Sequence, residues 1–198
     1  MDKRGSFSFL AEYLKRPKAV GAVLPSSKFL AQKMVAGIDF ENAKCIVEYG
    51  PGTGVFTELL LQRRKPDTMV IVFEMNDEFC QILNVRFGGE KNFKIISDSA
   101  ETIGAELANI TNGQPADCII SGLPFASLPD NVSHSILEET KKYLRPGGLF
   151  ITFQYTLLKK ALLSKYFNEI EIEREVRNLP PAYVVRCRDT APASAESL

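Results

Sequence analysis

Tryptophan is absent from the 198-residue chain, histidine occurs only at His134, and the four cysteines are far apart in the sequence. Zinc sites need clustered cysteine and histidine ligands, and no such spacing can be assembled from these residues. The sequence therefore predicts no metal centre and four reduced thiols, as in a cytosolic protein.

Long apolar runs are also missing. No segment approaches the roughly 20 apolar residues that cross a bilayer, and the N-terminus lacks the apolar core of a secretory signal. The length suits one domain with a sizeable core. We expect a cytoplasmic protein, either soluble or peripherally bound to a membrane.

Net charge is zero, with 24 basic and 24 acidic residues, so nothing global predicts a polyanionic partner. The first 33 residues nevertheless hold seven basic side chains against two acidic ones. Residues 6–16 place Phe7, Leu10 and Leu14 on one helical face. This segment is interpreted as an amphipathic helix lying in an anionic membrane surface, with a helix that caps the core as the alternative.

The most informative stretch is residues 44–61, KCIVEYGPGTGVFTELLL, which reads as strand, glycine turn and helix. Gly50, Gly52 and Gly54 allow positive φ and a close approach of the backbone to a ligand. The free N–H groups of the following helix point to the same place. A nucleotide-like ligand is predicted; a tight turn without a ligand is the alternative.

Spacing separates the ligand classes. The dinucleotide fingerprint needs a third glycine where Val55 stands, and the lysine of a phosphate-binding loop is missing. The pattern Glu48-x-Gly50-x-Gly52-x-Gly54 instead resembles the first motif of class I S-adenosylmethionine-dependent methyltransferases. The resemblance implies S-adenosylmethionine as cofactor, with these four residues beside its methionine part. A carboxylate there suits a ligand that carries an ammonium and a sulfonium.

After the glycine loop, strands and helices alternate, which predicts an α/β fold with a doubly wound, mostly parallel sheet. Two late strands joined by a proline turn resemble the antiparallel pair that completes the seven-stranded class I methyltransferase sheet, here preceded by N-terminal helices. Expected strands after the loop are 69–74, 93–97, 117–121, 149–155, 169–176 and 183–188, and expected helices are 76–87, 100–110, 131–144 and 156–167.

Polar residues stand at the carboxyl ends of the expected strands, where such sheets bind ligands. Glu74, about 20 residues after the loop, is placed to accept both ribose hydroxyls. The resemblance implies that Asp98 holds the adenine amino group and that Ser121 borders the cofactor. Solvated acids at strand ends are the alternative for Glu74 and Asp98.

Residues 121–125, SGLPF, follow the fourth strand. This segment resembles the Asn (or Asp)-x-Pro-Tyr or Phe motif that adenine-N6 methyltransferases, including the ribosomal RNA dimethylases, carry at the acceptor base. The resemblance implies that Gly122, Leu123 and Pro124 border the acceptor and that Phe125 acts in catalysis. Gly122 occupies the amide position, which weakens a purine acceptor. We expect no helical RNA-binding domain, because the chain has no residues left for one, and the sequence shows no basic stripe with interleaved aromatic residues. Nucleic acid is therefore not expected as a partner.

A second resemblance covers almost the whole chain. The segments PKAVGAVLPSS, EYGPGTGVFT, SGLPF, 153–155 and 177–182 resemble the bacterial soluble phospholipid N-methyltransferases. This resemblance implies stepwise methylation of phosphatidylethanolamine at a membrane surface. The alternatives are a ribosomal RNA adenine methyltransferase and a non-catalytic cofactor-binding module. We expect a helical segment over 1–37, a methyltransferase domain over 38–188 and a flexible tail over 189–198.

Methyl transfer to an amine requires placement and exclusion of water more than acid–base groups. Tyr13 and Tyr155 join Phe125 as catalytic candidates because they could contact the amine. Lys18 and Arg177 are substrate-binding candidates, since a basic side chain can hold the lipid phosphate. Asn178, within the segment 177–182, is a further substrate-binding candidate. No general base is evident, and the oligomeric state stays open.

Overall fold

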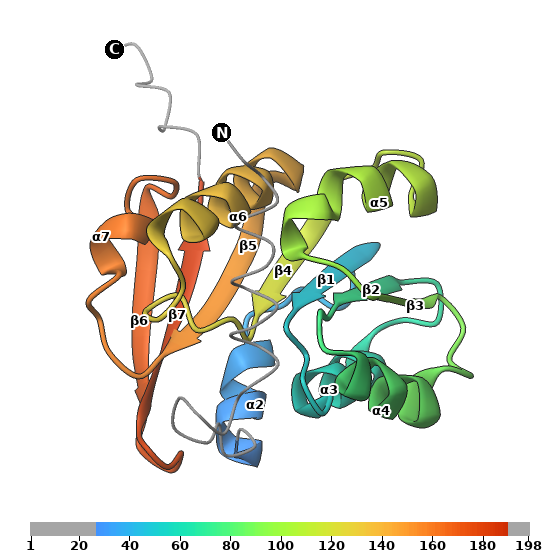
Figure 1. Ribbon diagram of the computed structural model, residues 1–198, viewed down its shortest axis with the longest axis horizontal. Helices are drawn as coiled ribbons and strands as arrows, with labels where there is room; N and C mark the ends of the chain where they lie inside the picture. The colour runs from blue at the N-terminus through green and yellow to red at the C-terminus, as the bar shows by residue number, and fades with distance from the viewer. Residues whose placement is uncertain (1–26, 190–198) are drawn as a thin grey trace.

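The computed structural model describes residues 27–189, which form a seven-stranded sheet with helices on both faces (Figure 1). The expected helix over 6–16 and both N-terminal site candidates, Tyr13 and Lys18, lie outside the described residues. So does the expected tail over 189–198, apart from Asp189. The helices are α2 (Lys28–Val35), α3 (Val55–Arg63), α4 (Asp77–Phe87), the 3-10 turn η2 (Ala100–Thr102), α5 (Ile103–Ile110), α6 (Asp130–Tyr143) and α7 (Lys160–Leu163). The strands are β1 (Cys45–Tyr49), β2 (Met69–Phe73), β3 (Phe93–Ile96), β4 (Ala116–Ser121), β5 (Leu144–Gln154), β6 (Glu169–Glu175) and β7 (Ala182–Arg188).

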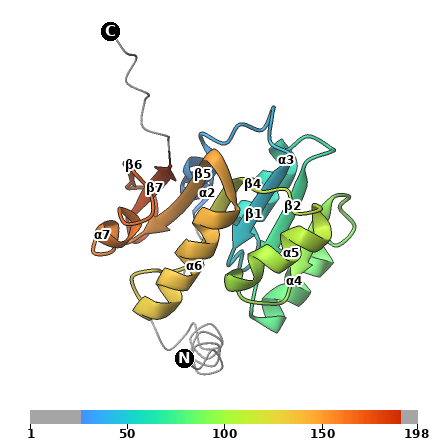
Figure 2. The ribbon, with the colours of Figure 1, turned by 90° about the horizontal axis from the view of Figure 1, so that it is seen from above.

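The sheet order is β3-β2-β1-β4-β5-β7-β6. The first five strands are parallel, and β7 runs antiparallel to both β5 and β6. Figure 2 shows β6 and β7 at one edge of the sheet, across the molecule from β2. The chain order reverses between β1 and β4, and the carboxyl ends at such a reversal are where ligands bind. The predicted fold class is confirmed.

Alternate residues of β1 pack against the two helical layers. Cys45, Val47 and Tyr49 belong to a core cluster with residues of α5 and α6, whereas Ile46 packs with residues of α2, α3 and α4. Figure 1 shows these layers above and below the sheet. Glu48 therefore points toward the α3 layer, although it lies in a strand that is buried throughout.

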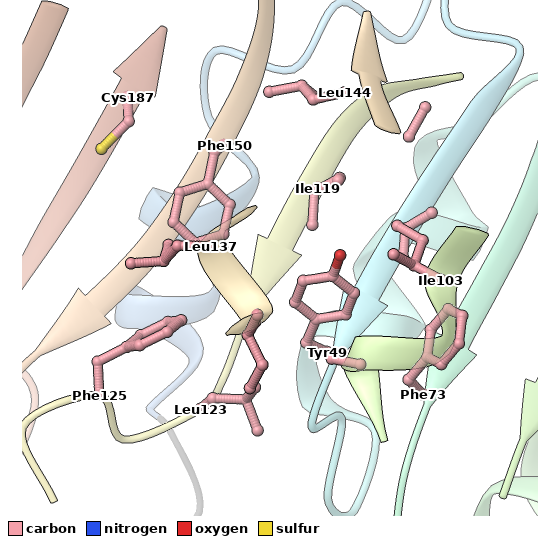
Figure 3. Close-up of a cluster of buried hydrophobic side chains, with 14 of the residues drawn as sticks. Tyr49, Phe73, Ile103, Ile119, Leu123, Phe125, Leu137, Leu144, Phe150 and Cys187 are labelled. Atoms are coloured by element: carbon pink, nitrogen blue, oxygen red, sulfur yellow. The ribbon is translucent and has the colours of Figure 1, made fainter. Parts of the chain in front are cut away.

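Aromatic rings fill the core layer under α5 and α6 (Figure 3). Tyr49 meets Phe73 edge to face with ring centroids 5.9 Å apart, and Phe125 meets Phe150 in the same way at 6.3 Å. Phe150 also stacks on Phe167 at 5.4 Å. Such pairs each add about 0.5–1.5 kcal/mol to the burial of their surface, and they bring residue 125 under the carboxyl edge of the sheet.

Helix α2 is held by the last strands of the chain. The Arg186 guanidinium on β7 donates to the main-chain oxygens of Lys33 at 2.8 Å and Ala36 at 3.2 Å, which are at the carboxyl end of the helix. Lys33 in turn forms ion pairs with Glu173 at 2.8 Å and Glu175 at 3.3 Å on β6. Helix α2 shares one core cluster with the sheet. The domain boundary at residue 37 stays a prediction.

Two expected elements differ from the structure. The helix predicted over 156–167 is wrong, because only the single turn Lys160–Leu163 is helical. Leu157 and Leu158 are exposed, and the buried apolar residues Leu162, Leu163 and Phe167 all lie in the later part of the segment. No apolar face is therefore buried over residues 156–159 to support a longer helix. Strand β5 begins at Leu144 rather than at residue 149, and a register shift opposite β4 accommodates the intervening residues.

Candidate cofactor and acceptor site

The glycine loop adopts the backbone that its sequence predicts. Gly50, Gly52 and Gly54 have φ of +62°, +56° and +86°. A Cβ at Gly50 would lie 2.9 Å from Leu123 Cδ2, and one at Gly54 would lie 2.7 Å from the Phe87 ring. A Cβ at Gly52 would meet nothing within 4 Å. Packing therefore requires the outer glycines, while the backbone at Gly52 is open to an approaching ligand.

Glu48 lies fully buried beneath this loop. Its Oε2 accepts a 2.6 Å hydrogen bond from the Thr57 hydroxyl in the first turn of α3, and its Oε1 has no partner. Burial raises the pKa of Glu48 to about 8; the Thr57 hydrogen bond opposes this rise, and the charge of Glu74 adds to it. An orphaned buried carboxylate oxygen is costly, so this position is suited to a cationic partner.

Glu74 follows β2 and is also buried. Its Oε2 accepts from the Gly52 N–H at 3.0 Å, and its Oε1 accepts from the Asn76 N–H at 2.9 Å. Burial raises the pKa of Glu74, while these backbone hydrogen bonds oppose the rise. The carboxylate thus reaches the glycine loop from the neighbouring strand. Its contact with a ligand stays a prediction.

Thr57 is the residue that sequence reasoning missed. It is a fully buried polar side chain on the helical face that also buries Phe56 and Leu60. A threonine within the apolar stripe of the first turn was the available signal, because a buried hydroxyl needs a hydrogen-bond partner. That partner is Glu48.

Asp98 and Ser121 stand at the ends of β3 and β4, with Asp98 partly exposed and Ser121 fully buried. Asp98 Oδ1 accepts from the Ser99 N–H at 2.7 Å, and Ser121 Oγ accepts from the Leu123 N–H at 3.2 Å. Both side chains therefore shape the turns at the carboxyl edge. Their contact with a cofactor stays a prediction.

Gly122 is packed against the glycine loop. Its N–H donates to the Tyr49 main-chain oxygen at 2.8 Å, and a Cβ there would lie 2.5 Å from the Gly50 main-chain oxygen. Such a distance cannot be relieved by a side-chain rotation, because the colliding atom is backbone. This conformation therefore leaves no space for a side chain at the position where adenine methyltransferases carry their amide.

The remaining residues of the segment point inward. Leu123 and Phe125 are 5% and 1% exposed and belong to the core cluster drawn in Figure 3, whereas Pro124 is partly exposed. The Phe125 ring packs edge to face on Phe150. We therefore assign Phe125 to the core and not to the acceptor site, because its ring does not face the surface.

Tyr155 and Asn178 come together from the chain after β5 and the turn between β6 and β7. Burial raises the pKa of the Tyr155 phenol, and a hydrogen bond with the Asn178 side chain opposes the rise. Asn178 Oδ1 accepts from the Ser27 N–H at 3.0 Å, and its Nδ2 donates to the Pro180 oxygen at 2.8 Å. The side chain of Asn178, a predicted substrate residue, thus links the start of α2 to the β6–β7 turn through hydrogen bonds.

Arg177 sits beside this fastening with its side chain 59% exposed. Its guanidinium donates to both carboxylate oxygens of Glu175 at 2.9 Å and lies 4.3 Å from the centroid of the Phe29 ring. The Arg177 hydrogen bonds lower the pKa of Glu175 to about 2. Arg177 is therefore a fixed, partly solvated cation at the carboxyl edge, available to an anionic group.

Within residues 27–189, no three histidine, cysteine, aspartate or glutamate side chains form a group that could hold a metal ion. None of the helices over the same range has both the length and the apolar composition to traverse a bilayer. All four cysteines are free.

Comparison with known proteins agrees with this geometry. The ribosomal RNA adenine dimethylase family model matches residues 18–170. An ornithine lipid N-methyltransferase from Singulisphaera acidiphila is 33% identical over 92% of this chain and 95% of its own length. Ribosomal RNA small subunit methyltransferase A from Borreliella burgdorferi is 34% identical, but over 56% of this chain and 36% of its own length.

A solved structure has the same fold. The N-methyltransferase NodS from Bradyrhizobium japonicum, in complex with S-adenosyl-L-homocysteine, superposes with a TM-score of 0.66 over 94% of this chain and 99% of its own, at 14% identity. The sheet order, the glycine loop and the two buried carboxyls define a class I S-adenosylmethionine-dependent methyltransferase. The chain belongs to the ribosomal RNA adenine dimethylase family and uses S-adenosylmethionine.

Proposed function

We propose that this methyltransferase acts on lipids, transferring methyl groups to the head-group amine of phosphatidylethanolamine and its partly methylated forms at a membrane surface. The observation that carries the proposal is the similarity to a lipid N-methyltransferase over nearly the full length of both chains. Similarity to the ribosomal RNA enzymes covers 56% of this chain and 36% of the enzyme from Borreliella burgdorferi, and 75% of this chain and 48% of the enzyme from Dehalococcoides mccartyi. An ornithine lipid is the second candidate acceptor, because the relative from Singulisphaera acidiphila is an ornithine lipid N-methyltransferase.

The packing of Gly122 supports a lipid over a purine acceptor. An adenine amine needs hydrogen-bond acceptors in its plane, and a buried polar site discriminates strongly when such acceptors are present. At residue 122 a side chain would collide with the Gly50 main-chain oxygen. An aliphatic head-group amine has no ring to orient, and it can be held through its phosphate instead.

S-adenosylmethionine supplies an activated methyl group when it is bound. Around it, the open backbone at Gly52 offers space, and the unpartnered oxygen of Glu48 belongs to a carboxyl whose ionised form a cationic ligand would favour. We assign the ribose hydroxyls to Glu74, which is supported by its hydrogen bond to the Gly52 N–H, and the lipid phosphate to the partly exposed cation of Arg177. Tyr155 is the remaining catalytic candidate within the described residues, near enough to Asn178 to be oriented by it.

Labelled S-adenosylmethionine, offered separately with phosphatidylethanolamine vesicles, ornithine lipid vesicles and ribosomal RNA, tests the proposal. We expect label in phosphatidylethanolamine and its methylated products. The matched control is Glu74→Ala, which should lose transfer to every acceptor because it damages the cofactor site.

Label in ribosomal RNA alone would contradict the lipid assignment. Label in ornithine lipid alone would identify ornithine lipid, and not phosphatidylethanolamine, as the acceptor. Cofactor binding without transfer to any of the three acceptors would support a non-catalytic binding module.

A further inference from the structure

Exposed apolar side chains gather at one edge of the folded domain. Five of the seven large apolar residues that the described structure leaves exposed lie in two short segments, one after β5 and one between β6 and β7. We call this group the apolar rim; its members are Tyr155, Leu157, Leu158, Val176 and Leu179.

The two segments of the rim are neighbours in space. Strand β7 pairs Tyr183 with Gln154 of β5 and Ala182 with Glu175 of β6, so both segments leave the sheet at the same end. A hydrogen bond between Tyr155 and the turn between β6 and β7 joins them. Figure 1 shows both segments at the lower left of the molecule.

The charge around the rim is positive. Arg177 lies within the second segment, and Lys160 is exposed after the first. Two carboxylates are paired beside these segments: Glu175 is buried and bound by both Arg177 and Lys33, and the exposed Asp130 is paired with Lys159, which follows Leu158. Basic side chains beside exposed leucines match a membrane surface that has anionic head groups above acyl chains.

The chain also enters the folded domain here. The Ser27 N–H is bonded to Asn178 in the β6–β7 turn, so residues 1–26 join the described structure at the rim. In sequence, those 26 residues carry five basic side chains against two acidic ones, together with Phe7 and Leu10. Ser27, the first described residue, therefore lies beside the rim, and the basic segment precedes it in the sequence.

We propose that the apolar rim is a bilayer contact surface of the folded domain itself, with Leu158 and Leu179 entering the acyl region. This inference rests on the proposed lipid function and adds a second contact beside the N-terminal segment. Leu158 is 84% exposed and Leu179 is 75% exposed, so both can enter a membrane without rearrangement of the core.

The absence of tryptophan makes a direct test possible, because each introduced tryptophan is the only one in the protein. The single variants are Leu158→Trp, Leu179→Trp and the control Val85→Trp, on full-length protein. Val85 is 87% exposed on α4, across the molecule from the rim (Figure 1). With vesicles of phosphatidylethanolamine and phosphatidylglycerol, emission at 158 and 179 should shift to shorter wavelength and be quenched by acyl-brominated lipid. Emission at 85 should not change.

A loss-of-binding pair complements the reporters. Leu158→Ser with Leu179→Ser should weaken vesicle partitioning at least tenfold, whereas the control pair Ile82→Ser with Val85→Ser should leave it unchanged. Both pairs should melt like the wild type, because these side chains are exposed.

Several results would contradict the proposal that the apolar rim contacts the bilayer. Emission at 158 and 179 that matches the Val85 control, equal loss of partitioning in both serine pairs, or a lower melting temperature of the rim pair would each do so. A change of self-association without lipid, seen by sedimentation velocity, would assign the rim to a second copy of the chain.

Failure of the rim and failure of the proposed function are separable by methyl transfer to detergent-dispersed phosphatidylethanolamine. The rim pair should retain this transfer. If methyl groups are transferred while the tryptophans at 158 and 179 stay in water, only the membrane role of the rim is contradicted. If these tryptophans insert into the bilayer but no lipid is methylated, the proposed function is contradicted and the membrane role of the rim is supported.

Discussion

Replacing Glu48 by glutamine tests the electrostatics of the cofactor site. In the folded protein the pKa of this buried carboxyl is about 8, against an ordinary value of 4.5. Between these values the unfolded chain releases the Glu48 proton and the folded protein keeps it. Stability from this residue is therefore complete below about pH 4.5 and is lost as the pH rises toward 8.

The magnitude follows from the width of that interval. At about 1.4 kcal/mol per pH unit, the full loss is roughly 5 kcal/mol. Glutamine has the same shape, keeps an acceptor for the Thr57 hydroxyl and does not ionise. The free energy of unfolding of Glu48→Gln, relative to the wild type, should therefore rise by about 1.4 kcal/mol per pH unit between about pH 5 and 8.

Urea denaturation at several pH values measures this difference. The control is Glu58→Gln, which removes a half-exposed carboxylate of α3 that pairs with Arg86. Its difference from the wild type should be nearly constant over the same range. A Glu48→Gln curve parallel to the wild type would refute the reasoning, because it would mean that Glu48 is ionised in the folded protein.

The same variant reports on the ligand. A cationic cofactor favours ionised Glu48, so binding of S-adenosylmethionine should release a proton and become tighter by up to about tenfold per pH unit below about pH 8. Calorimetry in two buffers of different ionisation enthalpy counts the released protons. Glu48→Gln should bind with no such release. Equal proton release in both proteins would place the titrating group elsewhere.

Three further changes are predicted. Glu74→Gln should weaken S-adenosylmethionine affinity at least tenfold by calorimetry, because a carboxylate acceptor for the ribose hydroxyls is lost, which is about 1.4 kcal/mol. An unchanged affinity, equal to that of the exposed control Glu78→Gln, would return Glu74 to a purely structural role. Gly122→Ala should cost about 1–3 kcal/mol in chemical denaturation, because its Cβ meets a main-chain oxygen of the glycine loop at 2.5 Å. Gly89→Ala, whose Cβ meets nothing within 4 Å, should cost far less, and equal costs would contradict the collision. Asn178→Ala should cost about 0.5–1.5 kcal/mol for each lost hydrogen bond in the same assay, because the partly buried Ser27 N–H and the Pro180 oxygen lose their partner. A stability equal to the wild type would show that water replaces the amide.

Local sequence signals were sufficient for much of the fold. Positive φ at three alternating glycines, the strand before them and the helix after them all follow from residues within one short window. The carboxylate at the end of β2 was predictable because parallel strands bring their carboxyl ends to one edge. The antiparallel β6–β7 pair was indicated by two short strands flanking Pro180 and Pro181.

The rest depends on contacts between distant parts of the chain. The pattern of residues 156–167 is helical, but the neighbours that would bury Leu157 and Leu158 are not there, and sequence alone could not reveal this. The direction of the Phe125 ring is set by Phe150, 25 residues further on. Asn178 was assigned to substrate by its place in a motif, although its amide is used by the start of α2.

The insertion of β7 between β5 and β6 has a consequence for synthesis. Strand β6 has no partner in the sheet except β7, and Arg186 of β7 holds the carboxyl end of α2, the first described helix. Until residues 182–188 leave the ribosome, β5 presents an open edge, β6 is unpaired and the last carbonyls of α2 lack this guanidinium. The nascent chain can assemble β1 to β5 in order, but it closes only when its beginning and its end meet. Ribosomes stalled before residue 182 should therefore carry a protease-sensitive chain with an aggregation-prone edge.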